Sequence, residues 1–120
     1  MNLFHTKDIN EDRFLITGGA GFIGSHIAEY LLKHGAKKVR VLDNLSNGFQ
    51  SNLNIQNQYP ACEFLEGDIR NLETCQQASS GIDYVSHQAA LGSVPRSIKQ
   101  PFLTNDVNVG GFVNILKSAV

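Results

Sequence analysis

The sequence has little of what marks several large classes of protein. Its two cysteines, Cys62 and Cys75, are spaced unlike the ligands of a zinc site and unlike a CxxC redox pair. Its net charge of −1 leaves no broad basic surface for the phosphate backbone of a nucleic acid. No uninterrupted apolar run reaches the roughly 18 residues that a membrane-spanning helix needs. These absences predict a protein without a metal site, a nucleic-acid partner or a membrane span.

The beginning of the chain also lacks the features of a secretory signal. Residues 1–12, MNLFHTKDINED, contain neither an apolar core nor a small-residue cleavage site. Two cysteines in a chain without such a signal favour reduced thiols and a cytoplasmic location. Because residues 1–12 are polar and unpatterned, we expect an N-terminal arm there and a domain over residues 13–120.

The rest of the chain alternates between short apolar runs and helical patterns. Its composition, 42% hydrophobic and 18% charged, is that of an ordinary globular domain. The apolar runs predict four buried strands, at residues 13–17, 39–43, 62–68 and 82–90. Helices are expected from Gly21 to a C-cap at Gly35, and after Asn71 as an N-cap. This alternation predicts an α/β fold in which a Rossmann-type parallel sheet carries helices on both faces.

The last part of the chain predicts one more helix. Residues 92–101 are expected to cross to it, with Pro101 in its first turn. Apolar residues mark one face of this helix, the pattern of a face that packs on a core: Phe102, Val109, Phe112, Val113 and Leu116. Because a doubly wound dinucleotide-binding fold has about six strands in two halves, four strands predict a truncated form of it. We therefore expect the N-terminal portion of a longer domain.

A glycine-rich turn joins the first predicted strand to the first predicted helix. Four glycines lie between Gly18 and Gly24, and they fit both Gly19-x-Gly21-x-x-Gly24 and Gly18-x-x-Gly21-x-x-Gly24. In a dinucleotide-binding turn the second glycine lets a pyrophosphate approach the backbone, and the third lets the helix pack on the sheet. The helix N-terminus then offers free N–H groups to the phosphates. The alternatives are a turn that binds nothing and a Walker loop, but the Gly-Lys-Ser/Thr of a Walker loop is absent.

Two acidic residues at the ends of predicted strands extend the pattern. Asp43 stands 19 residues after Gly24, where dinucleotide-binding folds place the acid that binds the adenosine ribose. A carboxylate there repels a 2′-phosphate, which predicts NAD rather than NADP; the alternative is that Asp43 only caps a loop. Asp68 ends the third predicted strand and Ile69 follows it, beside the expected adenine, where Asp68 accepts from the amino group and Ile69 packs on the ring. The alternative for Asp68 is a turn residue after Gly67.

Four motifs together resemble extended short-chain dehydrogenases/reductases of the NAD-dependent nucleotide-sugar epimerase/dehydratase group. They are TGGAGFIGSHIAEYLL, VLDNLSNG, EGDIRN and HQAALGSVPRS, and the likeness covers nearly all of the chain after Arg13. The resemblance implies a pyrophosphate bound by Gly18, Gly21, Phe22, Ile23 and Gly24. It implies an adenosine ribose surrounded by Asp43, Asn44, Ser46, Asn47 and Gly48, and an adenine held by Asp68 and Ile69. Beside the nicotinamide ribose it places Gln88, Ala89, Ala90 and Leu91.

The stretch ALGSVPRS, residues 90–97, resembles UDP-N-acetylglucosamine 4-epimerases in particular. That likeness places Gly92 and Ser93 against the sugar, although both also suit a loop that leads into a helix. The implied parent reaction is NAD-dependent epimerisation at C4 of UDP-N-acetylglucosamine or UDP-glucose through a 4-keto intermediate. UDP-glucuronate epimerases and decarboxylases, 4,6-dehydratases and a non-catalytic NAD-binding module remain alternatives. The resemblance also implies a homodimeric parent, with the helix over 101–120 as a candidate surface.

The catalytic pair that the resemblance implies is missing. The family's reaction needs Tyr-x-x-x-Lys, in which the tyrosine takes a proton from the sugar hydroxyl and the lysine lowers the tyrosine pKa. Four residues after Tyr30, Tyr59 and Tyr84 stand His34, Glu63 and Gln88. We therefore expect no catalytic residue in this chain and no turnover by it. Near the end, Asn108 is expected to tie its helix to the sheet, and Gly110 and Gly111 to permit close helix packing.

Overall fold

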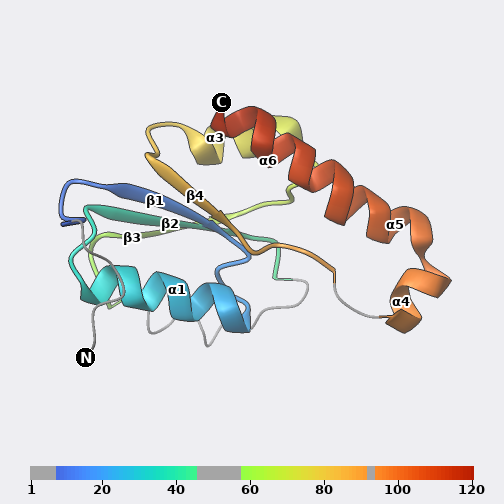
Figure 1. Ribbon diagram of the computed structural model, residues 1–120, viewed down its shortest axis with the longest axis horizontal. Helices are drawn as coiled ribbons and strands as arrows, with labels where there is room; N and C mark the ends of the chain where they lie inside the picture. The colour runs from blue at the N-terminus through green and yellow to red at the C-terminus, as the bar shows by residue number, and fades with distance from the viewer. Residues whose placement is uncertain (1–7, 46–57, 92–93) are drawn as a thin grey trace.

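A parallel sheet lies at the centre of the computed structural model, which describes residues 8–45, 58–91 and 94–120 (Figure 1). Its four strands have the order β3-β2-β1-β4. Their bounds are β1 (Arg13–Thr17), β2 (Lys38–Asp43), β3 (Cys62–Glu66) and β4 (Tyr84–His87). All four were predicted, but the third and fourth end earlier than expected. Residues 67–68 and 88–90 leave the strands because they turn into the wall of a cavity described below.

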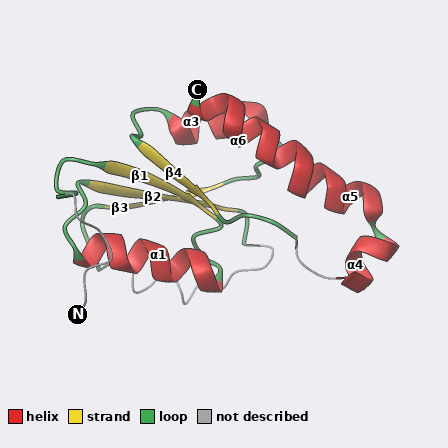
Figure 2. Ribbon diagram, viewed as in Figure 1, coloured by secondary structure: helices red, strands yellow, loops and turns green. Residues whose placement is uncertain are grey.

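Helices cover both faces of the sheet (Figure 2). Helix α1 (Phe22–Lys33) lies on one face, and α3 (Leu72–Ser79) and α6 (Gly111–Ala119) lie together on the other. The chain reaches α6 through α4 (Val94–Lys99), α5 (Pro101–Asn105) and the π-helical turn η1 (Asp106–Gly110). This is the predicted Rossmann-type α/β arrangement. Residues 92–101 were expected only to lead into the last helix, but within them the structure has a further helix, α4.

Alternate residues of the central strands supply two separate cores. Ile16, Val39 and Val41 face α1, where they pack with Ala28 and Leu32. Leu15 and Leu42 face the other layer, where they pack with Cys75 and Ala78 of α3 and with Val107 and Ile115 from the last helices. Successive strand residues point to opposite faces, so each central strand feeds both layers. The apolar runs of the sequence are continuous for that reason.

Local sequence signals begin and end the helices where expected. The Asn71 side chain accepts a hydrogen bond of 3.1 Å from the Thr74 N–H and so caps α3. Gly35 follows the last turn of α1 with φ +83°, in the left-handed region that favours glycine. Pro101 stands in the first turn of α5, which continues through η1 into α6. The three predictions are confirmed.

The prediction of which face the last helices bury is wrong. The last helices were expected to bury the face marked by Phe102, Val109, Phe112, Val113 and Leu116, yet these residues are 48–90% exposed. The buried stripe contains Val107, Gly111 and Ile115. A Cβ on Gly111 would collide with Ile69, so this glycine lets the helix approach, whereas a Cβ on Gly110 would meet only Asp106 Oδ1, at 3.2 Å.

The predicted N-terminal arm is also part of the fold where the structure describes it. Ile9 is 6% exposed and belongs to the core beside α1. The Asp12 carbonyl accepts a 2.9 Å hydrogen bond from the Lys37 N–H, which fixes the approach to β1 against the start of β2. A single apolar side chain in a polar stretch has no periodicity, so its burial could not be inferred from the pattern.

Candidate functional site

A cavity lies at the carboxyl ends of all four strands. Its walls come from the residues that follow each strand and from the inner side of α5 and η1: Gly18, Gly21, Leu42, Asp43, Asn44, Gly67, Asp68, Ile69, Arg70, Gln88, Ala89, Ala90, Leu91, Leu103 and Val107. The chain runs outward from β1 to β2 and β3, and then returns to place β4 on the other side of β1. The cavity therefore lies where open α/β sheets bind ligands, at the point where the strand order reverses.

The glycines of the turn after β1 have separate structural roles. Gly18 has φ +69°, and a Cβ there would come within 2.8 Å of the Ala89 nitrogen. A Cβ on Gly24 would collide with the Gly18 carbonyl oxygen, which confirms that this glycine lets α1 pack close to the turn. Gly21 lines the cavity, and a Cβ there would meet only that same oxygen, at 3.2 Å. Gly21 is thus the position where a ligand can approach the backbone.

The start of α1 suits an anion. Gly21 is the N-cap of the helix and has no side chain with which to cap the first turn. The backbone N–H groups of that turn and the positive end of the helix dipole are available to a phosphate group. The side chains of Phe22 and Ile23 are 79% and 61% exposed, and neither residue lines the cavity. What the start of the helix offers a ligand at these two residues and at Gly24 is the set of backbone N–H groups of its first turn.

Asp43 connects the glycine turn to the end of β2. Its carboxylate is buried, and its Oδ2 accepts a 2.9 Å hydrogen bond from the Ala20 N–H. Its Oδ1 accepts a 2.7 Å hydrogen bond from the Leu45 N–H. The side chain thus caps its own loop, as the alternative interpretation held. Each carboxylate oxygen has two acceptor sites, so these bonds leave acceptor capacity at the cavity wall.

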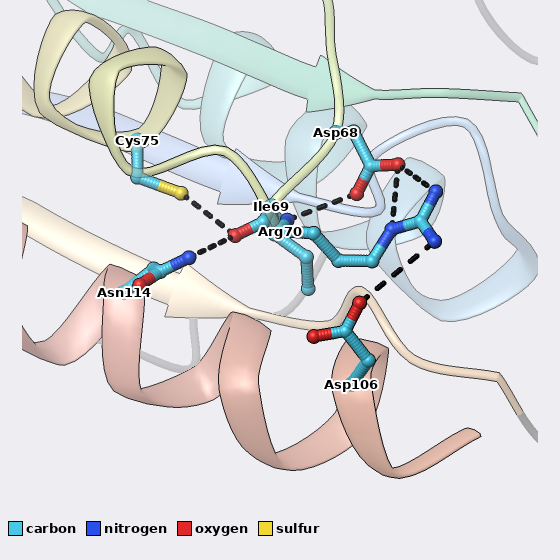
Figure 3. A network of polar contacts seen from close by, with 6 residues as sticks. All are labelled: Asp68, Ile69, Arg70, Cys75, Asp106 and Asn114. Carbon is cyan, nitrogen blue, oxygen red and sulfur yellow. Dashed lines mark hydrogen bonds and ion pairs between the residues drawn. The ribbon is translucent and has the colours of Figure 1, made fainter. Parts of the chain in front are cut away.

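An ion-pair network occupies the wall after β3 (Figure 3). The Arg70 guanidinium donates to Asp68 Oδ2 through Nε at 2.9 Å and through Nη2 at 2.6 Å. Its Nη1 lies 3.9 Å from Asp106 Oδ2 on η1. Hydrogen bonding to Arg70 lowers the pKa of Asp68 and keeps this carboxylate ionised. Asp68 Oδ1 accepts the Arg70 backbone N–H at 2.9 Å, which leaves that oxygen a second acceptor site.

The Ile69 carbonyl anchors the same loop from behind. It accepts hydrogen bonds from Asn114 Nδ2 of α6 at 2.9 Å and from the Cys75 thiol of α3 at 3.3 Å (Figure 3). Both cysteines are free, and burial raises the pKa of the Cys75 thiol, so it stays protonated and can donate. The Ile69 side chain packs against the bare backbone of Gly111. The loop after β3 is therefore fixed to both helices of this layer.

The wall after β4 is held by two polar side chains. Thr17 Oγ1 accepts from the Gln88 N–H at 3.0 Å and from the Ala89 N–H at 3.2 Å. Asn108 forms two hydrogen bonds with Leu91: its Oδ1 accepts from the Leu91 N–H at 2.7 Å, and its Nδ2 donates to the Leu91 oxygen at 2.9 Å. The predicted role of Asn108 in tying the helix to the sheet is thereby confirmed.

Most of the residues predicted from sequence meet in this cavity. Those that line it are Gly18, Gly21, Asp43, Asn44, Asp68, Ile69, Gln88, Ala89, Ala90 and Leu91. Five further residues line it that the sequence did not predict: Leu42, Gly67, Arg70, Leu103 and Val107. Outside the described residues lie Ser46, Asn47, Gly48, Gly92 and Ser93. Among the residues described, no cluster of His, Cys, Asp and Glu could hold a metal ion, and no helix has the length and apolar character to cross a membrane.

Comparison with known proteins identifies the family. The sequence model of the NAD dependent epimerase/dehydratase family matches residues 14–120. The chain belongs to this family. Membership confirms the predicted resemblance, the Rossmann-type fold and NAD as the cofactor.

Relatives of this epimerase/dehydratase chain are nucleotide-sugar enzymes. A putative UDP-glucose 4-epimerase of Methanocaldococcus jannaschii is 39% identical over 104 residues, which are 86% of this chain and 32% of that protein. The UDP-glucose 4-epimerase of Lacticaseibacillus casei is 39% identical over 105 residues, 86% of this chain and 30% of the relative. The chain thus spans about a third of the length of these relatives.

Solved structures share the fold over the same part. A dTDP-glucose 4,6-dehydratase of Streptomyces venezuelae, solved with NAD and TYD bound, is 38% identical and superposes with a TM-score of 0.83. The match covers 89% of this chain and 35% of that one. A UDP-glucose 4-epimerase of Stenotrophomonas maltophila, solved with NAD and formylated UDP-arabinopyranose, is 35% identical with a TM-score of 0.81, over 90% and 33% of the two chains.

Proposed function

We propose that the chain is the NAD-binding part of a UDP-sugar 4-epimerase and that the cavity holds the NAD. One observation carries the proposal: the glycine turn, Asp43, the loop after β3 and residues 88–91 meet in a single cavity at the strand ends. A dinucleotide needs these four elements together, because its two halves extend to either side of the pyrophosphate. When bound, NAD supplies an acceptor for hydride.

The residues present suit each part of NAD. Gly21 offers close approach to a pyrophosphate, and the first turn of α1, with Phe22, Ile23 and Gly24, offers backbone N–H groups. Asp43 and Asn44 receive the adenosine ribose, with Ser46, Asn47 and Gly48. Asp68 Oδ1 has an acceptor site for the adenine amino group, and Ile69 supplies an apolar surface for the ring. The nicotinamide ribose then lies beside Gln88, Ala89, Ala90 and Leu91.

The carboxylate of Asp43 selects NAD over NADP in this arrangement. Its buried position beside the Ala20 N–H fixes a negative charge next to the expected ribose. A 2′-phosphate would meet this charge and would lose the hydrogen bond that a ribose hydroxyl donates to it. The Arg70 guanidinium does not relieve the repulsion, because it is engaged by Asp68.

The parent reaction that we propose is C4 epimerisation of UDP-N-acetylglucosamine or UDP-glucose through a 4-keto intermediate. Its support is the ALGSVPRS stretch, with Gly92 and Ser93 placed against the sugar, and the relatives named as UDP-glucose 4-epimerases. A 4,6-dehydratase parent is the second candidate, because a structure of that class is 38% identical to this chain. A homodimeric parent and a cytoplasmic location remain predictions.

We further propose that this chain does not turn over substrate by itself. None of its three tyrosines is followed by lysine at the fourth position. In the implied reaction the tyrosine of such a pair takes the proton of the sugar hydroxyl, and the lysine lowers the tyrosine pKa. Incubation of the chain with NAD and UDP-N-acetylglucosamine should therefore give no UDP-N-acetylgalactosamine, and any turnover above a no-protein blank would refute this.

Calorimetric titration tests cofactor binding directly. Wild type should bind NAD more tightly than NADP. D43N should lose roughly 10- to 100-fold in NAD affinity, as expected for a lost hydrogen bond to a charged acceptor. The difference between its affinities for NAD and for NADP should be smaller than in wild type. E11Q is the control for loss of one negative charge, because the Glu11 side chain is 83% exposed and remote from the cavity. Equal NAD affinity in D43N and wild type would remove Asp43 from the site.

A further inference from the structure

Thr17 and His87 form a polar contact where the central strand β1 and the neighbouring edge strand β4 end. They are register partners on β1 and β4, and Thr17 is fully buried. Thr17 Oγ1 lies 2.7 Å from His87 Nδ1. The same oxygen lies 3.0 Å from the Gln88 nitrogen and 3.2 Å from the Ala89 nitrogen. One hydroxyl therefore has three hydrogen-bond neighbours at the start of the wall after β4.

The direction of each bond follows from the capacity of a hydroxyl group. A threonine hydroxyl has one proton and two acceptor lone pairs. The backbone N–H groups of Gln88 and Ala89 can only donate, so they use the lone pairs; the Gln88 N–H is shared with the Thr17 carbonyl oxygen, at 3.0 Å. The hydroxyl proton is then directed at His87 Nδ1. That nitrogen must accept, and the ring proton must sit on Nε2.

The surroundings of the ring favour this neutral form. Thr17 from β1 and Phe112 from α6, whose ring centroid lies 5.8 Å from that of His87, carry no charge. Burial lowers the pKa of His87, which keeps the imidazole uncharged at neutral pH. An imidazolium would present an N–H at Nδ1 to a hydroxyl whose lone pairs are already used. The neutral Nε2–H tautomer is the one that satisfies every group in the contact.

We propose that His87 is a positioning residue for the β4 wall, the name used below for residues 88–91. By accepting the Thr17 proton, it keeps both lone pairs of that hydroxyl directed at the Gln88 and Ala89 N–H groups. The position of this backbone matters, because the Ala89 nitrogen and the Gln88 carbonyl carbon would lie 2.8 and 2.9 Å from a Cβ on Gly18. The backbone of the β4 wall thus lies close to the glycine turn, so a displacement of the wall changes its fit to that turn. That this wall receives the nicotinamide ribose rests on the proposed function.

The tautomer can be measured without any cofactor. In a long-range ¹H–¹⁵N spectrum of the labelled protein at about pH 7, His87 should show a protonated Nε2 and an unprotonated Nδ1. His26 is the internal control, because its Nδ1 lies 2.6 Å from the Phe22 carbonyl oxygen, which can only accept. The two rings should therefore differ in the state of Nδ1, with His26 protonated there. A protonated Nδ1 on His87 would overturn the proposal.

Two substitutions separate positioning from packing. The Oδ1 of asparagine in H87N can accept in place of Nδ1, whereas leucine in H87L fills space without accepting. H87L should weaken NAD binding roughly 5- to 30-fold, while H87N stays within about threefold of wild type. H87L should also shift the backbone amide resonances of Gly18, Gln88 and Ala89, and H87N should largely preserve them.

The outcomes distinguish the two proposals. If wild type binds no NAD, the proposed function fails, and the tautomer and the amide resonances still decide the role of His87. If H87N and H87L weaken NAD binding equally, or move the amide resonances equally, the acceptor has no role and His87 only fills space. Urea unfolding midpoints of both variants, compared with wild type, show whether either loses the fold; if both do, the wild-type tautomer decides.

Discussion

Asp43 and Asp68 follow neighbouring parallel strands and line the same cavity, yet the protein holds them in different ways. Asp43 is 8% exposed and is fixed by backbone N–H groups of the glycine turn and of its own loop. Asp68 is more exposed and is fixed by an arginine side chain that also approaches Asp106. The Asp43 carboxylate is thus held by backbone groups, whereas the Asp68 carboxylate is held by a partly exposed arginine, although Ile69 fixes the backbone of its loop. We call the glycine turn with Asp43 the rigid end of the cavity and the Asp68–Arg70 pair its exposed end. Substitutions should affect the two ends unequally.

The largest effect is expected at the rigid end, in G24A. Alanine normally stabilises a helix by about 1 kcal/mol relative to glycine, but here its Cβ would collide with the Gly18 carbonyl. We expect a net loss of about 2–4 kcal/mol in the free energy of unfolding and no measurable NAD binding. Urea unfolding and calorimetry would measure both.

G81A is the matched control for this substitution. Gly81 has φ +73° with nothing within 4 Å of the added Cβ, so the cost should be about 1–2 kcal/mol and NAD affinity should be unchanged. If G24A were as stable as wild type, α1 would not be packed against the turn as described.

A smaller effect is expected at the exposed end, in R70A. Removing the guanidinium takes away the two hydrogen bonds that Asp68 Oδ2 accepts, so the carboxylate, still bonded at Oδ1 to the residue 70 N–H, can turn away from the expected adenine. Because the pair is partly exposed, unfolding free energy should fall by less than about 1 kcal/mol. NAD affinity should fall roughly 2- to 10-fold, since positioning is lost while the acceptor remains.

Nicotinamide hypoxanthine dinucleotide sharpens this test, because hypoxanthine presents an oxygen where adenine presents its amino group. Wild type should bind it less tightly than NAD, and R70A should discriminate less between the two. If R70A has the same affinity as wild type for both dinucleotides, the Arg70 side chain does not position Asp68 for adenine.

The smallest effect is expected from acid. The pKa of Asp68 is lowered in the folded protein by its hydrogen bonds to Arg70, so the pair stabilises the fold above the unfolded pKa of about 4. That stabilisation is lost as the pH falls through the lower, folded pKa. D68N should therefore be less stable than wild type at pH 7 by up to about 1 kcal/mol, and the difference should shrink at about pH 3. Urea unfolding at both pH values checks this, and a constant difference would contradict it.

The sequence predicts the rigid end better than the exposed one, for a physical reason. Glycine spacing, an apolar strand and a following acid are local patterns, and their geometry is dictated by one strand, one turn and one helix. Arg70 could not be recognised in this way, because its main partner, Asp68, lies in a loop without periodicity, and its second partner, Asp106, lies 36 residues further along the chain. A contact between distant segments leaves no periodicity in either of them.

The last helices show the same limit. Both of their faces carry apolar residues, so amphipathic patterning could not decide which face the sheet covers. The decision comes from Gly111, whose missing side chain lets Ile69 approach and turns Val107 and Ile115 inward. To predict which face of these helices is buried, one needs to know the surface of the sheet and of the loop after β3 on which they pack.

Titration of NAD into ¹⁵N-labelled protein would show whether NAD occupies the cavity at the strand ends. We expect saturable shifts of the amide resonances of Gly18, Gly21, Asp43, Ile69 and Ala89, with little change along the exposed side of α6 at Val113 and Leu116. Shifts confined to that exposed side, or no saturable shift at any of the cavity residues, would contradict the binding of NAD in this cavity.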